Sequence, residues 1–294
     1  MIPRLGTKII RGPQLLTSAF LRLANRELTP SDIGNWILWH IARKPLPQVR
    51  NRAEDQSDST ILLEVGGTEV WWPAEFPHDD LNLVWAEVFL PFPPNGHSYE
   101  HGACRVAAGM WVLDAGACEG FFVSYALRRG AKVLAIEPVR RLAYCLHKTF
   151  EAEVRLGTLI VVNTLVGHTV GGGFIQVTGS PVGARASSAI GEPVPAMTID
   201  ALLDAAVIPK VDFVKMDIEG SEVSALLGAR NTLRAYQPVL SVAVYHNASD
   251  ERQVKQIVVG SGVDYEMCVK GLVRNRGNLV HQVLHAWPKE RESF

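Results

Sequence analysis

Cysteine is scarce in this chain, and so is any excess of charge of one sign. The four cysteines include no CxxC pair, so neither a zinc site nor a disulfide framework is predicted, and a reducing, cytoplasmic environment is expected. The 29 basic and 30 acidic side chains give a formal net charge of −1. A nucleic-acid partner is not expected, because a phosphate backbone is bound by concentrated positive charge.

Long hydrophobic runs are also missing. No stretch approaches the roughly 20 apolar residues that a membrane-spanning helix needs. The basic residues near the N-terminus are not followed by an apolar region with a cleavage site, so no signal peptide is predicted. The most apolar helical segment, 33–42, is short. It suits a docking helix or a homodimer contact, with a helix lying on a bilayer surface as the alternative.

Length and composition predict one α/β domain with an N-terminal extension. Residues 1–59 are expected to form helices up to about residue 45 and then a polar linker. Residues 60–294 are expected to form the main domain. Its first part, 60–110, contains a predicted β-hairpin at 60–73 and an irregular, proline-bearing loop at 91–101.

Strands and helices alternate after residue 110. Strands are predicted at 112–115, 132–137, 159–164, 211–217 and 238–246, with helices between them. This alternation is typical of a Rossmann-like, mostly parallel sheet covered on both faces. Two further strands, near 265–269 and 279–286, are expected to close the sheet as an antiparallel pair.

The segment between the third and fourth of these strands is less regular. Residues 171–177 predict a turn and an extra edge strand, whereas 179–195 are rich in Gly, Pro and Ser. We expect the latter stretch to be an irregular lid or acceptor-binding loop.

The strand that ends in Asp114 leads directly into a glycine-bearing turn and a helix. Gly116 and Gly120 leave room for a ligand to approach the backbone and the helix N-terminus. The next strand ends in Glu137, at the distance where nucleotide-binding α/β folds place an acid on the ribose hydroxyls. The stretch therefore predicts a nucleoside-cofactor site.

Glycine spacing distinguishes between cofactors. The dinucleotide fingerprint requires two further glycines where this chain has Cys118 and Phe121, which weakens the alternative of an NAD-linked oxidoreductase. The S-adenosylmethionine turn has an acid, a glycine, a small residue and a second glycine, with one residue between each. Asp114, Gly116, Cys118 and Gly120 fit this pattern with one departure. S-adenosyl-L-methionine is therefore the expected cofactor.

Polar side chains follow several of the predicted strands. Glu137, Asn163, Asp217, Glu219 and His246 all fall at carboxyl ends of strands, where open parallel sheets bind ligands. An acid in such a position is often only a helix cap. Because all five share one rim, we expect a single crevice to collect them.

The reaction places a demand on these residues. A hydroxyl acceptor of a methyl group needs a nearby base or metal, and His246 and Glu219 are the candidate bases. Asp217 is expected to hold the donor or the acceptor. A divalent cation such as Mg²⁺ on Asp217 and Glu219 stays open, because two carboxylates are too few to assign one. His97 and His101 lie four residues apart among prolines and glycines, which disfavours a shared metal site.

Several motifs together resemble the FkbM-type methyltransferases, a class I S-adenosylmethionine-dependent family. They are Leu113–Phe121, Ile136–Pro138, Met197–Asp200, Tyr245–His246 and, most specifically, the Lys-x-Asp-x-Glu-Gly-x-Glu block from Lys215 to Glu222. The resemblance covers about 60–286 and implies a seven-stranded sheet with an antiparallel last strand. It also implies O-methylation of sugar-like or polyketide-like molecules. The chain departs from the family at Cys118, where asparagine is usual.

The candidate residues follow from the motifs and the resemblance together. The candidate donor-binding residues are Asp114, Gly116, Cys118, Gly120, Phe121, Glu137, Asn163 and Asp217. The candidate catalytic residues are Asp217, Glu219 and His246. The expected partner is a small-molecule acceptor. The alternative is a methyltransferase-like protein that binds a nucleoside and a partner protein without turnover.

Overall fold

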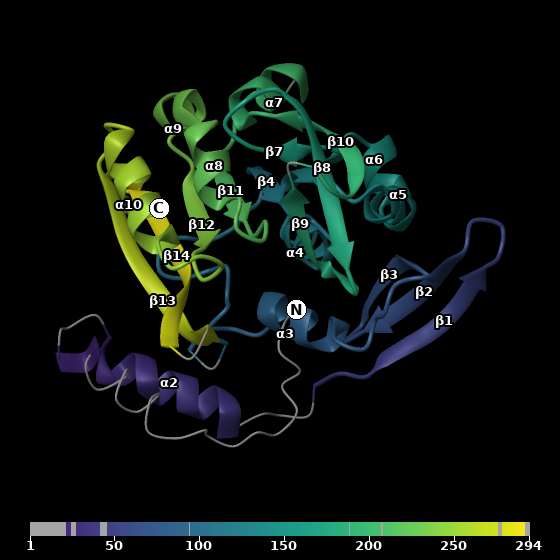
Figure 1. The fold of residues 1–294 in the computed structure, drawn as a ribbon, viewed down its shortest axis with the longest axis horizontal. Coiled ribbons are helices and arrows are strands. Elements are labelled where there is room, and N and C mark those ends of the chain that lie inside the picture. The colour runs from purple at the N-terminus through teal and green to yellow at the C-terminus, as the bar shows by residue number, and fades with distance from the viewer. Residues whose placement is uncertain are drawn as a thin grey trace.

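The computed structural model describes residues 22–24, 28–41, 46–93, 95–187, 189–206, 208–275 and 278–291. Its centre is a seven-stranded sheet with the order β13-β14-β12-β11-β4-β5-β6 (Figure 1). The strands are β4 (Trp111–Ala115), β5 (Lys132–Ile136), β6 (Leu159–Val162), β11 (Phe213–Met216), β12 (Val239–Ala243), β13 (Tyr265–Asn275) and β14 (Asn278–Pro288). The first predicted helix of the N-terminal extension lies largely outside the described residues.

The direction of the strands confirms the predicted architecture. β6, β5, β4, β11 and β12 are parallel neighbours. β14 runs antiparallel to both β12 and β13. The fold is therefore the expected Rossmann-like sheet with its last strand reversed.

Both faces of this sheet are buried because consecutive side chains of the parallel strands point to opposite sides. Val112, Val133, Phe213 and Val239 enter one apolar cluster, and the next residue of each strand enters the other. α4 (Phe121–Arg128) and α5 (Arg140–Thr149) contribute to the first cluster. The second takes α7 (Ile199–Ala206), α8 (Glu222–Leu227), α9 (Arg230–Tyr236) and α10 (Asp250–Gly260). The short α6 (Glu151–Arg155) follows α5.

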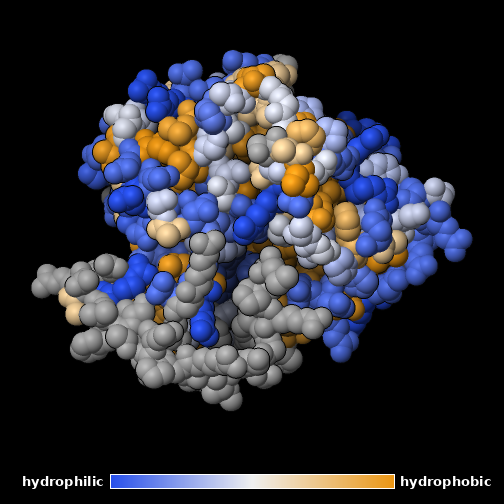
Figure 2. Space-filling model, in the orientation of Figure 1, coloured by the Kyte–Doolittle hydropathy of each residue, from blue (hydrophilic) through white to orange (hydrophobic). Residues whose placement is uncertain are grey.

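A three-stranded antiparallel sheet precedes the main sheet. It consists of β1 (Val49–Asp55), β2 (Thr60–Val65) and β3 (Thr68–Pro73). The hairpin of β2 and β3 is as predicted, but the segment expected to be a linker forms β1. Its central residues are exposed, and Figure 2 shows hydrophilic side chains over this corner of the molecule. The strand is stabilised by pairing with β2 rather than by burial, so the hydropathy pattern of these residues does not predict a strand. α3 (Leu81–Phe89) follows and was not predicted.

The segment expected to be irregular, 179–195, is largely strand. β7 (Leu165–Val166), β8 (Gly171–Thr178), β9 (Ser180–Ser187) and β10 (Glu192–Met197) form a second sheet in the order β7-β10-β8-β9. Pro193 and Pro195 lie in β10 where it pairs with β8 alone, since its pairing with β7 involves only Ala196 and Met197. Proline is tolerated at such an edge position because no ladder hydrogen bond is lost.

One N-terminal helix, α2 (Pro30–Ile41), lies against the end of the main sheet formed by β13 (Figure 1). Leu28, Leu272 and Leu279 form a small apolar cluster there, and Ile33 and Trp36 pack on it. A short 3₁₀ turn, η1 (Lys289–Arg291), follows β14. Within the described part of the chain, none of the helices combines the length and hydropathy that crossing a bilayer requires.

Candidate functional site

The bend after β4 is held between the ends of two neighbouring strands. The backbone N–H groups of Gly116 and Ala117 both donate to the carbonyl of Ile136, at 3.0 and 3.1 Å. Gly116 has φ of +80°, and a Cβ there would overlap the carbonyl oxygen of Asp217. Only glycine allows the bend and the end of β11 to lie this close.

A buried ion pair supports the bend from below. Asp114 on β4 and Lys215 on β11 are direct partners in the parallel register. Lys215 Nζ lies 3.0 Å from Asp114 Oδ1 and donates to the carbonyl oxygen of Gly116 at 2.8 Å. Burial raises the pKa of Asp114, although the charge of Lys215 opposes that shift. Asp114 therefore fixes the position of the bend and does not itself reach the pocket.

Glu137 follows β5 and connects the bend to the next helix. Its carboxylate accepts hydrogen bonds from the backbone N–H groups of Cys118 and Val139, both at 2.8 Å. Burial raises the pKa of Glu137 to about 7, and these hydrogen bonds limit the rise. The Asn163 amide donates to the carbonyl oxygens of Glu137 and Pro138, at 2.8 and 2.9 Å. Asn163 thus holds the backbone of this turn.

A pocket that is partly open to solvent joins this bend to the end of β11. Its floor is formed by Gly116, Cys118, Glu137, Asp217 and Glu219 with their neighbours. Its opposite wall comes from the second sheet, through Ile175, Pro181, Val182, Ala184 and Ala186. One side of the pocket is therefore lined by carboxylates and bare backbone, and the other by small apolar side chains.

Asp217, directly after β11, is the most heavily contacted carboxylate of the site. The Tyr99 hydroxyl donates to its Oδ2 at 2.7 Å, and His97 Nε2 lies 3.6 Å from the same oxygen. His97 Nδ1 in turn lies 3.6 Å from Glu87 Oε2 on α3. Burial alone would raise the pKa of Asp217, but the charges of His246, His97 and Lys215 and the Tyr99 hydrogen bond lower it.

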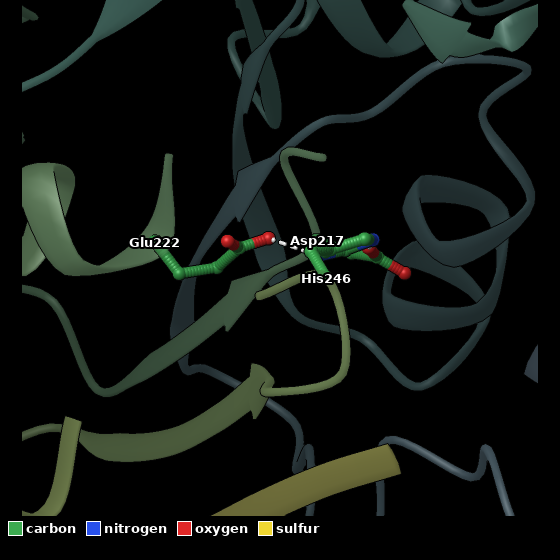
Figure 3. A group of neighbouring side chains, drawn as sticks. All are labelled: Asp217, Glu222 and His246. Atoms are coloured by element: carbon green, nitrogen blue, oxygen red, sulfur yellow. Dashed lines mark ion pairs between the residues drawn. The ribbon is translucent and has the colours of Figure 1, made fainter. Parts of the chain in front are cut away.

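His246, after β12, lies among three carboxylates. Its Nδ1 is 2.8 Å from Glu222 Oε1, and its Nε2 is 3.4 Å from Asp217 Oδ1 and 3.7 Å from Glu219 Oε2. Figure 3 shows Glu222 reaching from the start of α8 toward the imidazole. Burial disfavours the charged ring, but the contact with Glu222 and the three negative charges outweigh it and raise the pKa of His246 to about 9. These contacts favour the imidazolium form of His246 at neutral pH.

The metal question left open by the sequence concerns the same residues. Ligand-type atoms of Asp217, Glu222 and His246 lie within 4.8 Å of one another, and no other such group occurs among the described residues. However, Glu222 Oε1 already contacts His246 Nδ1 and accepts a hydrogen bond from the Ile218 N–H at 3.0 Å. Glu222 Oε1 is therefore engaged as in an ion pair, Glu222 Oε2 makes no hydrogen bond, and we assign no metal ligands.

The predicted site residues divide into two groups in space. Gly116, Cys118, Glu137, Asp217 and Glu219 line the pocket. Asp114, Gly120, Phe121, Asn163 and His246 lie around it without lining it: Phe121 is in the apolar core, and Gly120 has φ of +89° and lies against Phe150. The direct roles assigned to the second group stay predictions.

Three further residues contact the predicted site residues and were not predicted to do so: Glu222, His97 and Tyr99. Glu222 belongs to the most specific motif, and its spacing of five residues from Asp217 was an available signal. His97 and Tyr99 lie in the loop at 91–101, and nothing local in the sequence connects them to a strand end more than 110 residues away.

Comparison with known proteins places this site in a family. The profile of the Methyltransferase FkbM domain matches residues 114–278, more than half of the chain. The chain belongs to the FkbM methyltransferase family. The match begins at Asp114 and includes the bend, the Asp217 block and His246. It starts after β1–β3 and α3. No curated protein matches the chain.

Solved structures with a similar fold include several methyltransferases. An FkbM methyltransferase from Methylobacillus flagellatus KT is 22% identical, with a TM-score of 0.46 over 62% of this chain. The matched part of our chain covers only 44% of the length of the Methylobacillus protein. A precorrin-6Y C5,15-methyltransferase from Geobacter metallireducens GS-15 is 12% identical, with a TM-score of 0.40 over 64% of this chain and 84% of its own. Magnesium protoporphyrin IX methyltransferase from Synechocystis PCC 6803, solved with bound SAM, is 16% identical, with a TM-score of 0.36 over 62% and 71%.

Proposed function

We propose that this FkbM-family chain is an S-adenosylmethionine-dependent O-methyltransferase whose acceptor is a hydroxyl of a small sugar-like or polyketide-like molecule. The observation that carries the proposal is the pocket itself. It joins a glycine bend and a buried ribose-type carboxylate, Glu137, to the carboxylates Asp217 and Glu219. A nucleoside donor and a hydroxyl acceptor need these two halves side by side.

The residues of the pocket fit the donor. The bend presents backbone with no side chain at Gly116, and Glu137 keeps unused lone pairs that can accept hydrogen bonds from ribose hydroxyls. When bound, S-adenosylmethionine supplies an electrophilic methyl group on a positively charged sulfur. Asp217 and Glu219 orient the acceptor and attract this positive charge, and His246 behind them is the group that takes the hydroxyl proton. Mg²⁺ has no part in this proposal.

Methyl transfer is tested with labelled donor. The purified protein is incubated with S-adenosylmethionine carrying a ¹³C-methyl group and a panel of sugars and polyketides, and the products are analysed by mass spectrometry. We expect a mass increase of one labelled methyl group on an acceptor oxygen. Binding of S-adenosylhomocysteine without any methylated product would favour the non-catalytic, nucleoside-binding alternative.

We also propose that α2 supports a homodimer. Two large apolar side chains of this helix, Ile37 and Leu38, are 42% and 53% exposed, although Ile33 and Trp36 of the same helix pack on the small apolar cluster beside β13. Exposed apolar side chains next to one another favour contact with a second surface. Sedimentation velocity of the wild type and of the Leu38→Glu variant tests this arrangement.

A further inference from the structure

We propose that His246 gives up a proton to solvent when the sulfonium donor enters the pocket, and regains one from the acceptor hydroxyl during methyl transfer. This inference rests on the proposed function and concerns how the same site handles charge. It begins with the position of the imidazole. His246 contacts Glu222, Asp217 and Glu219 within 3.7 Å, and its side chain is 4% exposed.

The two nitrogens of this imidazole face different groups. Nδ1 contacts Glu222, which is fully buried at the start of α8 and outside the pocket lining. Nε2 faces Asp217 and Glu219, both of which line the pocket. The proton on Nδ1 is therefore retained, and the proton on Nε2 is the one exposed to changes in the pocket.

Entry of a cation changes the balance at Nε2. Asp217 and Glu219 stabilise the imidazolium before the donor binds, and the same two carboxylates then also neutralise the sulfonium. A second positive charge near a buried imidazolium disfavours its charged form. The interaction is strong because little water screens it. A neutral thioether in the same place exerts no such effect.

The surrounding groups do not replace the lost stabilisation. Asp217 is shared with Tyr99 and His97, and Glu219 lies 3.5 Å from Arg185 on β9. Asp250 on α10 is engaged by Asn247, and the Tyr245 ring lies 4.2 Å from the imidazole, centroid to centroid. Glu87 and Lys215 interact with Asp217 from farther away. Glu222 alone stays with the ring.

The charges balance over one reaction cycle. The acceptor oxygen forms a bond to the methyl carbon as the carbon–sulfur bond breaks, and the electron pair stays on sulfur. The O–H bond breaks, and its proton goes to Nε2 of His246. One positive charge disappears from the donor and one appears on the imidazole, so the site returns to the charge state that it had before donor binding.

Proton release can be measured without knowing the acceptor. S-adenosylmethionine and S-adenosylhomocysteine are titrated into the full chain by calorimetry at pH 6.5, in phosphate and in imidazole buffer with EDTA present. The two buffers differ in ionisation enthalpy, so the difference in heat reports protons. At this pH the amino group of each ligand is protonated, although the sulfonium lowers its pKa in S-adenosylmethionine, so the ligands' own titration does not contribute. We expect about one more proton to be released with S-adenosylmethionine.

Two variants assign this proton. His246→Asn should abolish the difference between the two ligands. His281→Asn should retain it, because His281 is also buried beside a glutamate, with Nδ1 2.9 Å from Glu251 Oε2, but does not lie at the pocket. Retention of the difference in His246→Asn would overturn the assignment. Its loss in His97→Asn at the same time would assign the proton to His97 instead.

A second measurement does not depend on a folded variant. If His246 releases a proton to solvent when S-adenosylmethionine binds but not when S-adenosylhomocysteine binds, the ratio of the two dissociation constants shifts in favour of S-adenosylmethionine by about tenfold per pH unit between pH 5.5 and 7. Equal proton counts and a constant ratio overturn the inference and leave the proposed function standing. Failure of both ligands to bind overturns the proposed function itself.

Discussion

Gly116 is the residue at which the two halves of the pocket meet. Replacing it with alanine adds a Cβ that overlaps the Asp217 carbonyl in a backbone with φ of +80°. Gly67 in the β2–β3 hairpin has φ of +79° with no neighbouring atom within 4 Å, so Gly67→Ala isolates the conformational strain, roughly 1–2 kcal/mol. We expect Gly116→Ala to lower the free energy of unfolding by about 2 kcal/mol more. Denaturation in urea measures both, and equal losses would contradict the tight approach.

Glu137 is the second residue on which donor binding depends. Glu137→Ala removes the acceptor of ribose hydrogen bonds, and we expect the dissociation constant of S-adenosylhomocysteine to rise by an amount equivalent to about 1–3 kcal/mol. Glu151→Ala on α6, where the glutamate side chain is 78% exposed, is the control. Calorimetry measures both. An unchanged affinity in Glu137→Ala would remove this carboxylate from the donor site.

His246 makes stability depend on pH. Its pKa is raised to about 9 in the fold, above the value near 6.5 of an unfolded histidine. The stabilisation is therefore complete below about pH 6.5 and is lost as pH rises through 9, by an amount on the order of 3 kcal/mol. We expect wild-type protein without donor to lose stability between pH 6.5 and 9 relative to His246→Gln. If the free energies of unfolding of wild type and His246→Gln change equally with pH over that range, the imidazole is not charged.

At the scale of elements, the second sheet is the part of the site that the sequence described least well. The edge strand predicted at 171–177 is present as β8, but the glycines and prolines of 179–195 predicted an irregular loop where β9 pairs with β8 and forms, with it, the apolar wall of the pocket. The expectation failed because strand pairing is decided by a neighbouring strand, whereas composition reports only local preferences. The alternating strands and helices of the main sheet were predicted correctly because each carries its own hydrophobic pattern.

This wall gives a prediction of its own. Ala184 on β9 lines the pocket, so Ala184→Trp should fill part of it and weaken binding of S-adenosylhomocysteine at least tenfold. Glu192 on β10 is exposed and does not line the pocket, and Glu192→Trp is the control. Fluorescence-monitored unfolding confirms that both variants fold, and calorimetry measures their affinity. Equal affinities would show that β9 lies away from the ligand.

At the scale of the whole molecule, α2 is attached to the main sheet through a small apolar cluster. Ile33 packs on Leu28, Leu272 and Leu279, whereas Leu38 on the same helix is 53% exposed. We expect Ile33→Asp to release the helix and to accelerate trypsin cleavage before β1, while Leu38→Asp does not. The main transition temperature should change little in either variant, because the two large apolar clusters lie elsewhere. Equal cleavage rates would contradict the docking.

The sequence by itself determined the alternation of strands and helices in the main sheet, the glycine bend and the carboxylates at the strand ends. These features follow from local patterns, since hydrophobic period, glycine position and strand termini are written within a few residues of one another. Only the tertiary structure decided that Asp114 forms an ion pair with Lys215, that Tyr99 and His97 contact Asp217, and that Glu222 forms an ion pair with His246. Each of these contacts joins segments far apart in the chain or depends on strand register, and hence on how the whole sheet packs.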